Sequence, residues 1–313
     1  MIEILIVVLP VFAVIAAGYA ATRAGYFSAA TIDGLMLFAQ GFAIPCMLFA
    51  AVARIDLGAV FAPGMMIAYY AGATVSFGLG MLGARTLFRR RPGEAVAIGF
   101  SALFSNSVLL GLPITARAFG EDALAPNYAI IAVHAPYCYL LGITVMEALR
   151  ADGRGAAETT RAVLRAMFRN ALMIGIAAGL AVNLSGLTLP APVWDAVDLV
   201  ARAALPAALF GLGGVLTRYS FRASLGETGM TIGLSLVVHP AITFVLGALV
   251  FGLGAGFLNS AVLTAAMAPG INSFLFASMY RRAEGVAAAT VLAATAVSVL
   301  TVPVWLLILR SWS

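Results

Sequence analysis

Two asparagine–serine pairs lie inside long apolar stretches, and each pair has a proline and a glycine nearby. The residues are Asn106, Ser107, Gly111 and Pro113 in the first stretch, and Pro269, Gly270, Asn272 and Ser273 in the second. Proline lacks an N–H group and clashes with the carbonyl four residues earlier, while glycine leaves helical geometry at low cost. We expect an interrupted helix in each stretch, broken at Gly111–Pro113 in the first and restarted on Asn272 and Ser273 in the second.

A helix that restarts inside a membrane presents free N–H groups and the positive end of its dipole. Two such ends at one point would suit a carboxylate. The amides of Asn106 and Asn272 can donate to it, with the hydroxyls of Ser107 and Ser273 as secondary donors. Two kinked helices packed through small residues would explain either stretch alone, but the occurrence of both favours a binding site.

The composition indicates a membrane protein. Of 313 residues, 63% are apolar and 10% are charged, and the mean hydropathy is +1.04. A soluble globule carries about a quarter charged residues, so soluble and disordered classes are excluded. The long apolar runs also lack the alternation of a membrane barrel. The chain is therefore predicted to be an all-α integral membrane protein in a lipid bilayer.

Long intervals without charge mark the helices that cross the membrane, because about 20 apolar residues span the hydrocarbon core. Seven intervals hold one helix each, and the interval from Glu227 to Arg281 is long enough for two. One further helix carries charges of its own. The sequence therefore predicts ten transmembrane helices.

The ten predicted helices divide into two five-helix repeats, which are inverted because five is an odd number. The landmarks that match in order are Pro45 with Pro206, Asn106-Ser107 with Asn272-Ser273, and Pro136 with Pro303. Each proline alone is an ordinary helix kink, but their paired placement favours a repeat. We assign residues 1–150 to the first repeat, 151–168 to a basic cytoplasmic linker and 169–313 to the second, inverted repeat.

Orientation follows from arginine, since the chain contains no lysine. Most arginines fall in alternate predicted loops, so the positive-inside rule places these loops in the cytoplasm and both termini on the outer side. The predicted location is the cytoplasmic (inner) membrane. The same bias explains the pI near 9.6, and we expect no nucleic-acid partner.

Five polar residues inside the predicted helices are candidates for coupling or gating. Asp198 and Arg202 are four residues apart, and a pair that neutralises itself is favoured over an ion site. His134 and His239 could carry protons, although a lone histidine among apolar residues is more often a packing residue. Gln40 faces either the helical core or the site, and both interpretations stay open.

The motifs Asn106–Pro113 and Pro269–Ala277 and the inverted ten-helix pattern resemble the auxin efflux carrier family over essentially the whole chain. That family includes plant PIN proteins and short bacterial carriers, and it shares an architecture with bile-acid/sodium symporters. The resemblance implies broken helices 4 and 9 that cross within a transport domain of helices 3–5 and 8–10. It also implies a fixed scaffold of helices 1, 2, 6 and 7, elevator-like alternating access and a homodimer through the scaffold helices.

Two features depart from the plant members of that family. The central loop is reduced to a short segment, which indicates a bacterial-type member, and Val108 stands where many relatives have a small residue. The substrate's shape therefore stays open.

The leading hypothesis is a secondary carrier for a small organic anion such as a carboxylate. Uniport and symport with Na⁺ or H⁺ both stay open. A membrane-embedded enzyme is the second class, but its chemistry needs clustered acids holding a metal or a base beside a nucleophile, and the predicted helices lack both. We therefore predict no catalytic residue, no metal site and no cofactor beyond a coupling ion. A receptor or a channel fits the inverted repeat less well.

Overall fold

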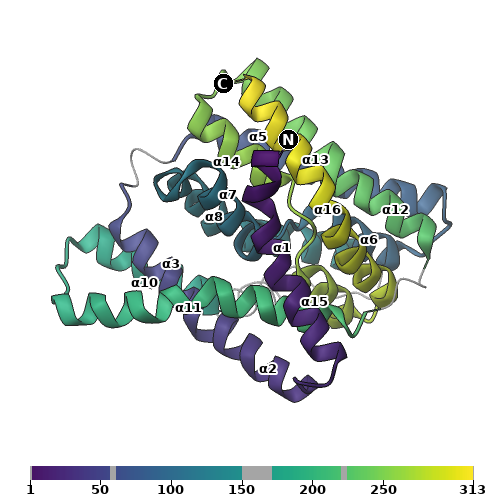
Figure 1. Cartoon of the computed structure of the whole chain (residues 1–313). Coiled ribbons are helices and arrows are strands. Elements are labelled where there is room, and N and C mark those ends of the chain that lie inside the picture. Colours follow the sequence, from purple (N-terminus) through teal and green to yellow (C-terminus); the bar gives the residue numbers. More distant parts are fainter. Residues whose placement is uncertain (1, 57–60, 150–170, 220–223, 313) are drawn as a thin grey trace. The chain divides into compact units, whose positions relative to one another are not determined.

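The computed structural model describes residues 2–56, 61–149, 171–219 and 224–312, with side chains from residue 6 onward, and these segments are helical (Figure 1). They contain no strand, and Ser105 and Pro269 form an isolated bridge. Helix is the expected state, because each backbone group in a bilayer must find a hydrogen-bond partner within the protein.

Seven helical stretches in the described part of the chain are long and apolar enough to cross a membrane. They are 6–23, 29–54, 63–86, 121–149, 191–216, 225–250 and 284–312. Three further apolar helical stretches are shorter, at 107–119, 171–185 and 255–265. The short stretches occupy the places of predicted helices 4, 6 and 9. The all-helical membrane fold is thus confirmed, while the ten-helix inverted repeat stays a prediction.

The chain forms two compact units, and each draws on both halves of the sequence. Unit 1 comprises Met1–Leu9, Ala62–Thr160 and Tyr219–Ser313, and unit 2 comprises Pro10–Phe61 and Arg161–Arg218. Apart from Met1–Leu9, these are the groups of segments that the family resemblance implies. The predicted division into residues 1–150, 151–168 and 169–313 describes sequence repeats rather than compact units, and it stays a prediction.

Unit 2 is a packed set of helices. They are the greater part of α1 (Ile2–Arg23), α2 (Ala29–Phe38), the π-turn η1 (Ala39–Ala43), α3 (Ile44–Arg54), α10 (Ala171–Ser185) and α11 (Ala191–Leu216). Helices α3 and α10 lie close together at Gly175, where an added Cβ atom would come within 2.4 Å of the carbonyl oxygen of Pro45. The Asn183 amide donates to the carbonyls of Val52 and Ile55 at the end of α3, at 3.0 and 2.7 Å. Small residues and side-chain caps therefore join these helices.

Unit 1 contains most of the helices. They are α5 (Pro63–Thr86), α6 (Pro92–Leu103), η2 (Ser107–Gly111), α7 (Leu112–Phe119), η3 (Glu121–Leu124), α8 (Ala125–Leu149), α12 (Leu225–Gly233), η4 (Leu234–Val238), α13 (His239–Phe244), η5 (Val245–Val250), α14 (Ala255–Ala265), α15 (Ile271–Tyr280) and α16 (Glu284–Trp312). Every residue of α6 from Ala95 to Leu103 is buried. Helix α6 is therefore at the core of this unit.

Three π-turns each end two residues before a proline. The π-turns η1, η2 and η4 precede Pro45, Pro113 and Pro240. A π-turn makes i→i+5 hydrogen bonds, which widen the helix where the proline ring would otherwise clash with a carbonyl. The chain can therefore accept these prolines without ending the helix.

Helix α1 also contains a proline, and it runs through both units. Pro10 has no N–H, so the carbonyl of Ile6 loses its helical donor. Arg117 of α7 donates to the carbonyl oxygens of Ile6 and Val7, at 3.2 and 2.8 Å. The first turns of α1 are thereby attached to unit 1.

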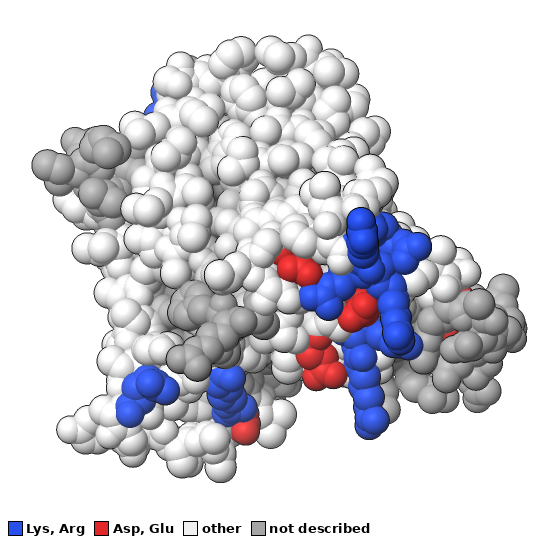
Figure 2. All heavy atoms as spheres, turned by 90° about the vertical axis from the view of Figure 1, so that its right-hand side faces the viewer, with Lys and Arg blue, Asp and Glu red and all other residues white. Residues whose placement is uncertain are grey.

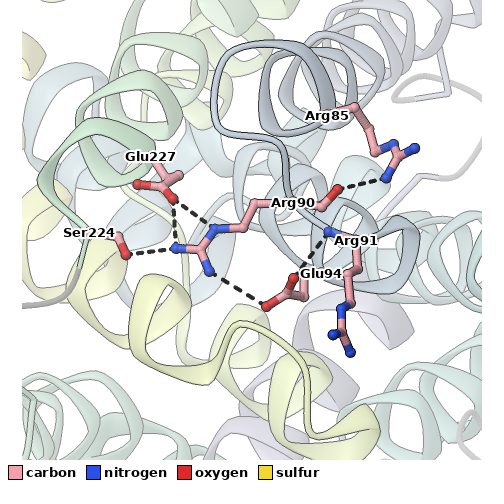
Figure 3. A network of polar contacts seen from close by, with 6 residues as sticks. All are labelled: Arg85, Arg90, Arg91, Glu94, Ser224 and Glu227. Carbon is pink, nitrogen blue, oxygen red and sulfur yellow. Dashed lines mark hydrogen bonds and ion pairs between the residues drawn. The ribbon is translucent and has the colours of Figure 1, made fainter.

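Charged side chains gather in a few groups on the face of the molecule in Figure 2, and most of that face is uncharged. One ion-pair network in unit 1 is centred on Arg90 (Figure 3). Its guanidinium contacts the buried carboxylate of Glu227 at 2.7 Å and the Ser224 hydroxyl at 2.8 Å, and it lies 3.5 Å from Glu94. This arginine joins the α5–α6 loop to the start of α12.

Candidate functional site

Each of the two stretches that were predicted to be interrupted contains an interruption, and both interruptions lie in unit 1. Helix α6 ends at Leu103, residues 104–106 are not helical, and the chain is helical again from Ser107. Helix α14 ends at Ala265, residues 266–270 are not helical, and α15 begins at Ile271. Neither segment is therefore a continuous helix.

The two interruptions lie side by side and run antiparallel, and we call the place where they pair the crossing. Ser105 and Pro269 form an antiparallel bridge. The Asn106 N–H donates to the Ala268 carbonyl at 2.8 Å, and the Gly270 N–H donates to the Phe104 carbonyl at 3.1 Å. Each interruption therefore pairs backbone groups that the other leaves without helical partners, which lowers the cost of two breaks at membrane depth.

The first interruption lies earlier in the chain than predicted. We expected it at Gly111–Pro113, but those residues are helical, because the π-turn before Pro113 accommodates the proline ring. The restart instead follows Asn106, whose side-chain oxygen accepts a hydrogen bond from the Leu109 N–H at 3.2 Å. Asn106 is thus the N-cap of the second half of this helix.

The second interruption also differs in detail. Gly270 is the N-cap of α15, and Asn272 and Ser273 lie in the first turn rather than at the cap. The Asn272 side-chain oxygen accepts a hydrogen bond from the Tyr139 hydroxyl at 3.3 Å. The Ser273 Oγ is buried and has no hydrogen-bond partner among the described residues. Gly270 has the extended backbone of an N-cap, and it and Ala268 form hydrogen bonds with the first interruption, so the helix begins after it.

Both asparagines use their oxygens within the protein and keep their nitrogens as donors. A backbone N–H can only donate, so the Leu109 contact fixes the Asn106 amide with its oxygen inward. Asn106 is 6% exposed, and its Nδ2 has no partner in the described part of the chain. Two amide donors therefore accompany two helix N-termini at one crossing.

Tyr69, which no sequence pattern indicated, and His134, which was a candidate for coupling or gating, hold Ser105 in place. The Tyr69 hydroxyl lies 2.6 Å from the Ser105 Oγ and 3.4 Å from His134 Nδ1. His134 Nε2 lies 3.2 Å from the Ser105 carbonyl oxygen. Since a carbonyl can only accept, Nε2 carries the proton and Nδ1 is the acceptor. Tyr69 and His134, both buried, thus bind the hydroxyl and the carbonyl of Ser105.

His134 therefore contacts the crossing directly, whereas His239 does so through Tyr69. The His239 Nε2 lies 3.2 Å from the Tyr69 carbonyl oxygen, and its ring centroid is 5.0 Å from that of Tyr69. His239 follows the π-turn η4 but makes no side-chain cap there. Both histidines are buried and hydrogen-bonded, as expected of packing residues. Their part in proton coupling stays a prediction.

Aromatic rings line the neighbourhood of Asn272. Phe100 and Phe276 are stacked with centroids 3.9 Å apart, and the Tyr139 ring lies 5.7 Å from Phe100 and 5.9 Å from Phe104. The polar groups at the crossing are thus bordered by apolar surface. This combination suits a ligand that has an anionic group on a small carbon skeleton.

The remaining candidates, Asp198, Arg202 and Gln40, belong to unit 2. The expected pair between Asp198 and Arg202 is wrong, because Arg54 of α3 donates twice to Asp198, with both bonds at 2.9 Å. Arg54 also lies over the Trp194 ring, 4.2 Å from its centroid. A planar guanidinium binds a carboxylate through two parallel bonds, which fixes the partner from another helix. In the described segments, no group of three His, Cys, Asp or Glu residues could hold a metal ion.

An apolar helical chain in which two interrupted helices cross has the architecture of a membrane transporter. A family model described as "Membrane transport protein" matches residues 3–306. The chain therefore belongs to this family, that of the auxin efflux carriers, and is an integral membrane transport protein rather than an enzyme. A protein of Rhizobium meliloti (strain 1021) named "Putative malonate transporter" is 26% identical over 315 residues, which cover 99% of this chain and 97% of that protein.

Proposed function

We propose that this protein is a secondary carrier that moves a small organic anion across the cytoplasmic membrane, with the anion bound at the crossing. The observation that carries the proposal is the pairing of the two interruptions through Asn106 N–H and Gly270 N–H, which brings two helix N-termini together. N–H groups and helix dipoles favour a carboxylate. Asn106 and Asn272 add amide donors, and Ser107 and Ser273 add hydroxyls.

The first substrate to test is malonate, because a relative of almost equal length bears the name of a malonate transporter. Malonate carries two carboxylates on one carbon, and the crossing offers two N-termini. The aromatic rings of Phe100, Phe276 and Tyr139 would limit the size of the skeleton. A short dicarboxylate therefore fits this set of groups.

For the mechanism, we propose ten transmembrane helices in two inverted repeats, with both termini outside and an elevator-like movement. Unit 1 contains the crossing, so it would carry the anion, while unit 2 would serve as the scaffold and dimer contact. In support, unit 2 has its own packed helices and its own Arg54–Asp198 pair. Its contacts are therefore independent of the crossing. Coupling to Na⁺ or H⁺, as in the bile-acid symporter architecture, is the alternative to uniport.

The test is flux in liposomes that contain the purified protein. Labelled malonate, acetate and succinate would be offered to the wild type, Asn106→Ala and Asn272→Ala, with Na⁺ and pH gradients imposed separately. We expect saturable flux of at least one anion, and its loss in both variants. Asn259→Ala, an asparagine of α14 outside both interruptions, is the matched control and should retain flux. Unchanged flux in both site variants, with normal insertion, would overturn the assignment.

A further inference from the structure

A group of arginines lies at one end of unit 1, apart from the crossing. They belong to residues 85–94, around the α5–α6 loop, and to residues 281–284, around the α15–α16 loop. The two loops lie side by side, since a Cβ atom on Gly93 would come within 3.5 Å of the Arg282 Nε. We call this end of unit 1 the basic face, and its arginines are Arg85, Arg89, Arg90, Arg91, Arg281 and Arg282.

Acidic side chains neutralise only part of this charge. The six arginines are accompanied by three glutamates, Glu94, Glu227 and Glu284, which leaves a net charge of +3. Two of these acids bind the same arginine, because Glu94 and Glu227 both contact Arg90. Within the described segments, none of the other five arginines is ion-paired. In Figure 3 the Arg91 side chain points away from the Arg90 guanidinium.

The contacts of Arg90 fix the loop that carries its neighbours. Its guanidinium binds Glu227 and Ser224, at 2.7 and 2.8 Å, and so attaches the loop to the start of α12. Arg89 and Arg91, on either side of Arg90, are exposed. A guanidinium has five N–H donors and binds a phosphate through two parallel hydrogen bonds. An attached loop therefore offers two exposed guanidinium groups to an anion.

Exposed leucines border the basic face. Leu82, Leu87 and Leu225 have 58%, 72% and 74% of their surface exposed. The α5–α6 loop and the start of α12 touch, because a Cβ atom on Gly226 would lie 2.5 Å from the Phe88 ring. A small soluble anion gains nothing from apolar side chains, whereas a lipid brings acyl chains that can contact them. The combination therefore favours a lipid over a free phosphate.

The basic face also lies where lipid headgroups are expected. The stretch 63–86 ends at it, and the stretches 225–250 and 284–312 begin at it, and all three are long and apolar enough to cross a membrane. The end of such a helix lies at the level of the headgroups, where arginine side chains reach the phosphates. The positive-inside rule accounts for the number of arginines here, but not for their arrangement around one neutralised arginine and beside exposed leucines.

We propose that the basic face binds the headgroups of anionic phospholipids. Arg89 and Arg91 bind the phosphate, and Leu87 and Leu225 contact the acyl chains. The net positive charge favours an anionic headgroup over a zwitterionic one. Helices α6 and α15 each run between this face and the crossing, so the bound lipid acts on the far ends of the two half-helices that flank it. The inference does not depend on which solute the protein carries.

The experiment measures the melting temperature of the purified full-length protein in micelles of a neutral detergent, with phosphatidylglycerol or phosphatidylcholine added. A lipid that binds the folded state raises the melting temperature as its concentration rises. We expect phosphatidylglycerol to act at a lower concentration than phosphatidylcholine, and we expect high salt to reduce the difference. Inorganic phosphate at the same concentration should not reproduce the shift, because it has no acyl chains.

Arginine variants make the test specific to the basic face. Arg89→Gln and Arg91→Gln should each raise the half-maximal phosphatidylglycerol concentration by about fivefold, and the double variant by about twentyfold or more. Arg23→Gln is the matched control, because Arg23 is exposed at the end of α1 in unit 2, on the same predicted side of the membrane. It removes the same charge elsewhere and should respond to phosphatidylglycerol as the wild type does.

The possible results separate this inference from the carrier proposal. Equal responses to the two lipids, an equal shift with inorganic phosphate, or an unchanged response in the double variant would overturn the lipid site. A double variant with a normal lipid response but a raised KM for malonate flux would mean that these arginines attract the solute instead, which also overturns it. A lipid response that follows the variants, in a protein without anion flux, would support the lipid site and count against the carrier.

Discussion

The two interruptions share a backbone pairing but are closed by different means. The first is short, Asn106 caps the half-helix that follows it, and Tyr69 and His134 bind Ser105 within it. The second runs from 266 to 270, is capped by a glycine and is supported by one 3.3 Å bond from Tyr139 to Asn272. Similar Asn-Ser motifs therefore do not occupy equivalent positions. The first interruption is held by more side-chain contacts than the second.

The largest expected difference concerns the two tyrosine hydroxyls. Tyr69→Phe removes the partner of a buried serine, and we expect the unfolding free energy to fall by about 1–3 kcal/mol. Tyr139→Phe removes a longer bond to a half-buried asparagine and should lower it by less than about 1 kcal/mol. Chemical denaturation in detergent micelles measures both values. Equal losses would mean that the two interruptions are equally supported.

Replacing the two asparagines should lower the stability of the protein by different amounts, although we expect flux to need both. Asn106→Ala removes an N-cap, so we expect the unfolding free energy to fall by about 1 kcal/mol. Asn272→Ala removes a side chain from the first turn of α15 and should lower the unfolding free energy by only a few tenths of a kcal/mol. The same denaturation curves, read beside liposome flux, test this. A larger loss of stability for Asn272→Ala would reverse the comparison.

The glycines should give the smallest effects, with opposite signs. A Cβ atom on Gly111 or Gly270 would meet neighbours no closer than 3.7 and 3.5 Å, so neither position excludes alanine. Gly111→Ala lies within a helix and should stabilise by about 0.5–1 kcal/mol. Gly270→Ala weakens an N-cap and should destabilise by a few tenths of a kcal/mol. Thermal unfolding of the two variants side by side measures the signs. Strong destabilisation by either variant would indicate closer packing at the crossing.

The sequence predicted which two stretches are interrupted, because proline and glycine within an apolar stretch often disturb a helix locally. Only the second interruption lies at its proline and glycine, Pro269 and Gly270. The exact limits of the interruptions were less predictable, because a proline can either end a helix or induce a π-turn before it. At Pro113 the chain forms the π-turn, and the break lies before Asn106 instead.

The partners of the site came from distant parts of the chain and carried no signal in the sequence. Tyr69 is 36 residues from Ser105 and 65 from His134, and no spacing rule relates them. Long separation along the chain is also the reason why the partner predicted for Asp198 was wrong. The i,i+4 rule indicated Arg202, while the observed partner, Arg54, is 144 residues away.

Helix α1 has a consequence for any movement between the two units. It is one continuous helix, yet its residues up to Leu9 group with unit 1 and those from Pro10 onward group with unit 2. At Pro10 the helical hydrogen bond to Ile6 is already absent, and Arg117 supplies the replacement from unit 1. In the elevator-like movement that we propose, α1 would bend at Pro10, where the helical hydrogen bond to Ile6 is already missing. Its first two turns would then move with unit 1.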